Sequence, residues 1–252
     1  MKIKVTHRHN DPAHISIFTG ITCNLACTIC GPSASSRWRS ELGMGKFSYD
    51  EYTIDSSEII TEVEDYDFSN VEYVRFGGGE PLLNNTSLAI FKRLNRKVDI
   101  LLHSNGTVLP TQEYLAEFFR FDRFVLVFSV DDVEEQFEFL RWPAKWNNVV
   151  DNILWMKENC PSNVRFAFNT VVSLLNEPTH TRVRDWANQH IPTNNAGIET
   201  VWFTNETNGL LNRISDANSQ DSVQFLDQLD TRRGTNWRKT FPIYASNFVV
   251  TA

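Results

Sequence analysis

Residues 21–33 read ITCNLACTICGPS and bring three cysteines, Cys23, Cys27 and Cys30, within eight positions. The chain of 252 residues contains one other cysteine, Cys160, far downstream. Thiolates grouped on a short loop bind zinc or an iron–sulfur cluster, or they are unrelated to one another. Zinc would need a fourth ligand such as Cys160 or a histidine, whereas three thiolates leave one iron of a 4Fe–4S cluster open. The spacing alone leaves these alternatives open.

Around this stretch, short β-branched or aromatic runs alternate with longer runs of helical periodicity, which predicts repeated βα units and a parallel sheet. The predicted strands cover residues 14–19, 71–77, 97–104, 123–131, 163–172 and 198–205. The predicted helices lie around residues 54–64, 85–95, 111–120, 146–159 and 179–190, with another at 221–230. Six units predict an α/β fold with a partial (β/α)6 barrel over residues 1–205. A short, irregular C-terminal extension over residues 206–252 is expected to pack on this barrel.

Polar motifs follow the predicted strands in turn. In parallel α/β sheets, ligands bind beyond the carboxyl ends of the strands. The cysteine stretch follows the first strand, GGGEP (77–81) the second, SNGT (104–107) the third and SVDD (129–132) the fourth. These stretches are therefore expected to meet at one face of the sheet.

The glycine-rich stretch combines backbone freedom with one carboxylate. Glycines let the backbone approach a ligand closely and leave its N–H and C=O groups available. Glu80 and those backbone groups are suited to hold an ammonium group. The simpler interpretation is a strand-to-helix turn that carries an acidic side chain.

Taken together, the C-x3-C-x2-C spacing and FGGGEPLL (76–83) resemble the radical S-adenosylmethionine (SAM) superfamily over roughly residues 14–205. The resemblance implies that Cys23, Cys27 and Cys30 hold one 4Fe–4S cluster, whose open iron binds the methionine part of SAM. It implies an oxygen-sensitive enzyme that cleaves SAM reductively to a 5′-deoxyadenosyl radical, which abstracts hydrogen from a substrate. An external electron donor such as flavodoxin or ferredoxin would supply the electron.

The resemblance also implies a set of residues that contact SAM. The motif that contacts the SAM amino group is represented by Gly78, Gly79, Glu80 and Pro81. Further SAM contacts are implied at the ends of the third, fourth and fifth predicted strands. These residues are Ser104, Asn105, Ser129, Asp131 and Asn169. Ile29 stands where the family usually has an aromatic residue that packs on adenine.

Two of these assignments have structural alternatives. Ser129 and Asp131 are equally suited to cap the following helix. Arg75 matches an arginine that contacts substrate in the molybdopterin-forming members, and a surface or paired arginine is the alternative.

The substrate class is the least determined feature. The cysteine stretch is most similar to twitch and SPASM-type proteins, although the cysteines for an auxiliary cluster are missing, and this favours a peptide or protein side chain. The alternative is a nucleotide or pterin-like small molecule of the deazaguanine- or molybdopterin-pathway type. A second alternative is a non-catalytic metal-binding barrel, against which the three cysteines and Glu80 count.

Composition excludes several other classes. The net charge of −7, from 31 acidic and 24 basic residues, disfavours a nucleic-acid partner. The most apolar run, FVLVFSV (124–130), is far shorter than a membrane span. The N-terminus lacks the apolar region of a signal peptide, and the clustered cysteines do not form a disulfide framework. We therefore expect a cytoplasmic protein with no membrane association.

Overall fold

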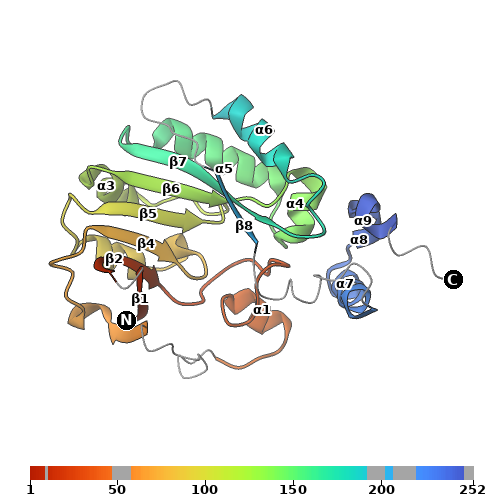
Figure 1. Ribbon diagram of the computed structural model, residues 1–252, viewed down its shortest axis with the longest axis horizontal. Coiled ribbons are helices and arrows are strands. Elements are labelled where there is room, and N and C mark those ends of the chain that lie inside the picture. Colours follow the sequence, from red (N-terminus) through yellow and green to blue (C-terminus); the bar gives the residue numbers. More distant parts are fainter. Residues whose placement is uncertain (9–10, 47–57, 192–201, 207–219, 247–252) are drawn as a thin grey trace.

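The computed structural model describes residues 1–8, 11–46, 58–191, 202–206 and 220–246. Its centre is one eight-stranded sheet in the order β3-β1-β2-β4-β5-β6-β7-β8 (Figure 1). The strands are β1 (Lys2–Arg8), β2 (Asp11–Phe18), β3 (Glu58–Glu62), β4 (Tyr73–Gly77), β5 (Asp99–Ser104), β6 (Phe124–Ser129), β7 (Val164–Val172) and β8 (Trp202–Glu206). The six strands β2, β4, β5, β6, β7 and β8 are parallel, which confirms the predicted α/β fold and partial barrel.

Helices follow the parallel strands, and several of them cover one face of the sheet (Figure 1). They are α1 (Ser36–Glu41), α2 (Thr86–Phe91), α3 (Gln112–Arg120), α4 (Glu134–Leu140), α5 (Trp146–Asn159), α6 (Thr181–His190), α7 (Gln220–Arg233), α8 (Trp237–Thr240) and α9 (Pro242–Ser246). Short 3-10 helices cover Val63–Asp65 and Pro81–Leu83. None of the helices in the described residues is both long and apolar enough to cross a membrane.

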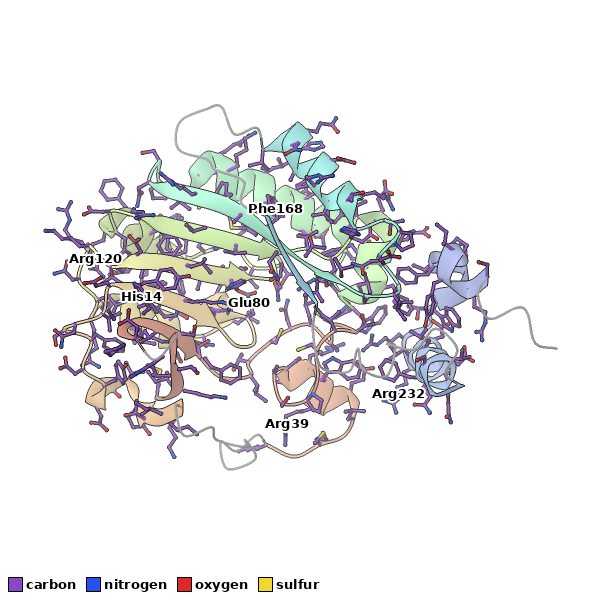
Figure 2. All side chains as sticks on the ribbon, in the orientation of Figure 1. His14, Arg39, Glu80, Arg120, Phe168 and Arg232 are labelled. Carbon is purple, nitrogen blue, oxygen red and sulfur yellow. The ribbon has the colours of Figure 1, made fainter. Side chains whose placement is uncertain are left out.

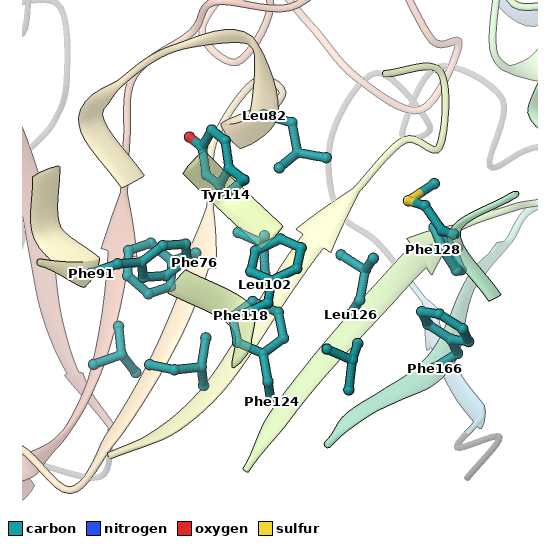
Figure 3. Packing of buried hydrophobic residues seen from close by; sticks show 14 of the residues in the cluster. Phe76, Leu82, Phe91, Leu102, Tyr114, Phe118, Phe124, Leu126, Phe128 and Phe166 are labelled. Carbon is teal, nitrogen blue, oxygen red and sulfur yellow. The ribbon is translucent and has the colours of Figure 1, made fainter. Parts of the chain in front are cut away.

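The main core lies between the sheet and its covering helices. Aromatic rings from the strands and from α2 and α3 pack edge to face around Phe91, which lies 4.8 Å from Phe76 (Figure 3). Phe118 of α3 and Phe124 of β6 are closer still, with ring centroids 4.2 Å apart. Burying such rings is the largest favourable contribution that single side chains make to folding.

Side chains along each strand alternate between the face of the sheet that packs on this core and the opposite, more polar face. In β5, Ile100 and Leu102 are buried under the helices, whereas Leu101 and His103 point to the other face and are half-buried. Successive side chains of a strand point to opposite faces, so each strand contributes one row to the core and one to the inside of the partial barrel. The row of side chains that faces the inside of the partial barrel lines the candidate functional site.

Two parts of the sheet were predicted wrongly or not at all. Residues 58–62 form β3 rather than the helix expected around 54–64; the preceding residues lie outside the described part of the chain. The β-branched run EIITE pairs antiparallel with β1, and this tertiary pairing outweighs its helical spacing. β1 itself was not predicted. The tail contains two further short helices, α8 and α9, where an irregular segment was expected.

Candidate active site

The three predicted cysteines lie on the loop that joins β2 to α1, residues 19–35, here called the cysteine loop. The N–H of Cys23 donates to Ser36 Oγ at 3.0 Å, and its carbonyl accepts from the same hydroxyl at 3.1 Å. A turn brings the N–H of Cys30 to the carbonyl of Cys27 at 3.0 Å. The indole of Trp38 donates to that same carbonyl at 2.8 Å. Helix α1 therefore holds the loop backbone at two of the three cysteines.

The end of α4 supports the middle of the cysteine loop. The N–H of Ala26 donates to the carbonyl of Trp142 at 2.7 Å, and that of Thr28 donates to Leu140 at 2.8 Å. Backbone groups that are paired in this way cannot swing without leaving buried donors unsatisfied. The positions between the cysteines are therefore fixed.

A third support comes from α7. Arg233 is buried and donates to the carbonyl of Ala26 at 2.9 Å. Its guanidinium pairs with Glu41 at N–O distances of 3.1 and 3.2 Å and lies 4.7 Å from the centroid of the Trp38 ring. The C-terminal part of the described chain thus contacts the cysteine loop directly.

All three cysteines are free thiols that line one cavity of about 430 Å³, between the cysteine loop and the sheet, here called the central cavity. Burial raises the pKa of Cys23 to about 11 and also raises the pKa values of Cys27 and Cys30. Such thiols keep their protons until a metal displaces them. Within the described ranges no three His, Cys, Asp or Glu side chains form a group that could hold a single metal ion. Three sulfur donors that line one cavity are a donor set that fits an iron–sulfur cluster.

The glycine motif is packed against the cysteine loop through its backbone. The N–H of Gly79 donates to the carbonyl of Gly20 at 2.8 Å, and that of Glu80 donates to Thr22 at 2.7 Å. Gly78 has a φ of +123°, a conformation that side-chain-bearing residues rarely adopt. A Cβ on Gly79 would lie 2.2 Å from the carbonyl oxygen of Thr22. Two of the three glycines are therefore required by this close approach.

We expect Gly79→Ala to lower the free energy of unfolding by about 1–3 kcal/mol, because the new methyl group forces the two loops apart. Gly77→Ala is the matched control, since a Cβ at Gly77 meets no atom within 4 Å. Urea unfolding of both variants measures the difference. Equal stability of the two variants would show that the loops separate without cost.

Glu80 is completely buried and does not line the central cavity. Its carboxylate accepts hydrogen bonds from the N–H of Asn105 at 2.6 Å and from the N–H of Leu82 at 3.1 Å. It lies near the carboxyl end of β4, among the strand ends (Figure 2). Glu80 here ties the glycine motif to the loop after β5, and its contact with the SAM amino group stays a prediction.

The titration of Glu80 makes the stability of the cluster-free protein depend on pH. Burial raises the pKa of Glu80 from 4.5 to about 7, against the effect of its hydrogen-bond donors. The folded state therefore holds this proton more tightly than the unfolded state. The resulting stabilisation is complete below pH 4.5 and is lost as the pH rises through 7.

We expect the wild type to lose about 2–3 kcal/mol of stability between pH 5 and pH 8 relative to Glu80→Gln, which does not titrate. Urea unfolding at a series of pH values measures this difference. Parallel curves for the two proteins would contradict the raised pKa.

Most of the other predicted SAM residues are brought together around the central cavity. The predicted residues that line it, besides the cysteines, are Ile29, Gly78, Gly79, Ser104, Asn105, Ser129, Asn169 and Arg75. Asn105 Nδ2 donates to the side-chain oxygen of Asn24 at 3.0 Å, so the loop after β5 also contacts the cysteine loop. Pro81 begins a 3-10 helix and does not line the cavity.

Asp131 is also buried away from the cavity, because it pairs with an arginine that the sequence analysis missed. Arg141 Nη2 donates to Asp131 Oδ1 at 2.9 Å, and Nε lies 2.8 Å from Oδ2. The N–H of Val171 also donates to Oδ1, at 3.0 Å. Arg141 lines the cavity beside the cysteines. It belongs to no sequence motif, so only the folded structure reveals this position.

Arg75 lines the central cavity together with His103 and Lys4, which sequence reasoning did not assign to the site. Arg75 Nε donates to His103 Nε2 at 3.0 Å. The alternation of His103 with the buried residues Ile100 and Leu102 was the sequence signal that would have placed it on the inner face.

Comparisons with known proteins agree with this geometry. Residues 17–183 match the family model described as the radical SAM superfamily. A search of curated proteins found no match. The fold is similar to Streptococcus suis SuiB bound to S-adenosylmethionine, with a TM-score of 0.52, 12% identity and coverage of 87% of this chain and 48% of SuiB.

Two further structures are similar. SuiB bound to the precursor peptide SuiA gives a TM-score of 0.50 at 12% identity, over 87% of this chain and 46% of SuiB. TYW1 with a lysine–pyruvate adduct gives a TM-score of 0.48 at 13% identity, over 87% of this chain and 73% of TYW1. The chain thus spans about half the length of SuiB. Because the family match covers well over half of its residues, the chain belongs to the radical SAM superfamily.

Proposed function

We propose that the chain binds one 4Fe–4S cluster through Cys23, Cys27 and Cys30 and binds SAM beside it in the central cavity. When bound, these groups supply reductive cleavage of SAM to a 5′-deoxyadenosyl radical that abstracts hydrogen from a substrate. The observation that carries the proposal is that three free thiols and two motif glycines line one cavity at the carboxyl ends of parallel strands.

The chain's own residues have positioning roles in this proposal. The glycine motif presents its backbone at the cavity wall, where close approach to the SAM amino group needs no side chain. Ser129 and Asn169, paired across β6 and β7, offer polar groups for the SAM ribose or carboxylate. Ile29 packs against the core and offers an apolar surface to adenine.

Arg141 contributes a buried cation to the same wall. Its pairing with Asp131 holds the guanidinium in place, and its position on the cavity wall lets it face a carboxylate group of SAM. We infer that the role of Asp131 is indirect, because it orients Arg141 at the cavity wall, and the proposal keeps the predicted contact of Glu80 with the SAM amino group.

We propose a peptide or protein side chain as the substrate. The similarity of the cysteine stretch to peptide-modifying members supports this, and SuiB, which shares the fold, binds a precursor peptide. A nucleotide or pterin-like molecule is the alternative, and the cavity of about 430 Å³ has the size of a small-molecule site. The proposal includes a cytoplasmic location, an external electron donor, and division into a barrel over 1–205 and an extension over 206–252.

The test is anaerobic reconstitution followed by incubation with a reductant and SAM. We expect about four irons and matching sulfide per chain, and the release of 5′-deoxyadenosine measured by chromatography. Candidate peptides, GTP and pterin-like compounds are then compared by how far they stimulate this release. Zinc without sulfide, or SAM that stays intact, would contradict the proposal. Stimulation by a nucleotide alone would replace the peptide assignment.

A further inference from the structure

The sulfur of Cys23 accepts two hydrogen bonds from the protein around it. The N–H of Leu25 donates to Cys23 Sγ at 3.4 Å, and the side-chain nitrogen Nδ2 of Asn105 donates to the same atom at 3.9 Å. The first donor belongs to the backbone of the cysteine loop itself. The second lies on the loop after β5, 82 positions further along the chain. The amide of Asn105 is therefore a side chain of another element that reaches a predicted cluster ligand.

The orientation of the Asn105 amide is determined by a backbone donor. The N–H of Thr107 donates to Asn105 Oδ1 at 2.9 Å, and the Thr107 hydroxyl donates to the same oxygen at 2.6 Å. A backbone N–H can only donate, so the amide atom that faces Thr107 must be the oxygen. The other amide atom, which faces Cys23, is then the nitrogen with its two hydrogens. Hydrogen bonding thus permits only the orientation that directs an N–H at the sulfur.

Asn24, the residue after Cys23, joins Asn105 and Thr107 in a closed ring of hydrogen bonds. Thr107 Oγ1 gives its only hydrogen to Asn105 and accepts from Asn24 Nδ2 at 2.8 Å. Asn24 Oδ1 in turn accepts from Asn105 Nδ2 at 3.0 Å. Each bond in such a ring polarises the next and strengthens it. Asn105 is also buried, and its backbone N–H is bound to Glu80, so the amide is held at the sulfur from both ends.

The hydrogen-bonding capacity of the Asn105 side chain is used completely within the protein. An asparagine amide has two hydrogens to donate and an oxygen with two lone pairs. Thr107 occupies both lone pairs, and the two hydrogens go to Asn24 and Cys23. Asn105 lines the central cavity, yet its amide has no donor or acceptor left for SAM. This bonding disfavours the SAM contact that was predicted for Asn105 and favours a role directed at Cys23.

We infer that Asn105, held by Asn24 and Thr107, is a positioning residue that raises the reduction potential of the cluster through its bond to Cys23. The inference rests on the proposed function, because it takes Cys23 to be a cluster ligand. Reduction adds negative charge to a cluster and to its sulfur ligands. An N–H directed at one of these sulfurs stabilises the reduced state more than the oxidised state, and hydrogen bonds to sulfur are known to set cluster potentials. A higher potential lets a weaker electron donor reduce the cluster.

The experiment is a redox titration of the cluster-loaded protein without SAM, followed by electron paramagnetic resonance. Asn105→Leu removes both amide donors at similar side-chain size. At a given potential we expect the ratio of reduced to oxidised cluster to fall about tenfold, which for one electron is a shift of about 59 mV to lower potential. Asn105→Ser is a second variant whose hydroxyl still accepts from the N–H of Thr107 but ends one bond short of the amide nitrogen. It should lower the potential in the same direction.

Two control variants separate the N–H···S bond from general effects on structure. Thr107→Val breaks the ring but keeps the backbone N–H that orients Asn105, so it should shift the potential far less than Asn105→Leu. Asn163→Leu makes the same chemical change elsewhere, where the amide binds the carbonyls of Phe118 and Phe121. This variant should leave the potential unchanged.

Each outcome decides the inference. It is supported if both Asn105 variants hold the cluster at a lowered potential and the controls do not follow. It is overturned if neither variant lowers the potential, if Thr107→Val or Asn163→Leu lowers it equally, or if both Asn105 variants lose the cluster. Weaker SAM binding at an unchanged potential would restore the predicted SAM contact and also overturn it. Failure of the proposed function is distinguishable, since it appears in the wild type as missing iron and sulfide or as uncleaved SAM.

Discussion

Replacing Cys27 with alanine is expected to reduce the iron content of the reconstituted protein from about four atoms per chain to below one. Cys27 is the most buried of the three thiols, and its carbonyl is held by Trp38 and Cys30. We expect that the two remaining thiolates, Cys23 and Cys30, do not retain the cluster when a chelator is added. Release of 5′-deoxyadenosine should fall at least a thousandfold, because every later step depends on the reduced cluster.

Cys160→Ala is the matched control, since it also removes one thiol, which is partly buried. Cys160 follows α5 and packs against the core, and burial raises its pKa to about 12. Iron, sulfide and SAM cleavage should be unchanged in this variant. Equal losses of iron in the two variants would mean that the cysteine loop is not the cluster site.

Replacing Arg141 with methionine is expected to lower the free energy of unfolding by about 3–5 kcal/mol. The change leaves the fully buried Asp131 with the N–H of Val171 but without its counter-charge. An unpaired buried carboxylate is far costlier than the intact pair, whose desolvation is already offset by two close contacts. Urea unfolding of the cluster-free protein measures the loss.

Two controls separate the charge effect from simple truncation. Arg123→Met breaks an exposed pair with Asp99 and should cost no more than about 1 kcal/mol. The double variant Asp131→Asn with Arg141→Met should recover much of the loss, because the uncompensated charge is then absent. A loss in Arg141→Met no larger than in Arg123→Met would refute the importance of the buried pair.

The parallel part of the sheet was predictable because each of its strands is a short run of β-branched or aromatic residues between turn signals. A short apolar run such as FVLVFS of β6 predicts a buried strand. β1 and β3 were not predictable in this way. KIKVTHR and EIITE mix charged and apolar residues, and they become strands by pairing with each other at the sheet edge.

The site was predictable to the extent that it depends on motifs. The spacing of the cysteines and the run of glycines are local, and both line the cavity as expected. The burial of Glu80 depends on its contact with Asn105, a motif residue that is distant in sequence, and the buried pair of Asp131 depends on Arg141, which lies outside the motifs. Arg75, His103 and Lys4 line one cavity only because four strands, β1, β2, β4 and β5, pair side by side. The spacing of residues in a single sequence does not predict which residues of different strands line the same cavity.

The bond between Arg233 and Ala26 joins residues 207 positions apart, and this sets an order of events during synthesis. At the usual rate of translation, α7 is made roughly 10 to 40 s after the cysteines have been added to the chain. Throughout that interval the cysteine loop lacks the buried guanidinium that fixes its backbone and covers Trp38. Iron delivered to the nascent chain in that interval would meet a cysteine loop with one of its three supports still missing. Cluster insertion is therefore expected to follow the completion of α7, as a maturation step after translation.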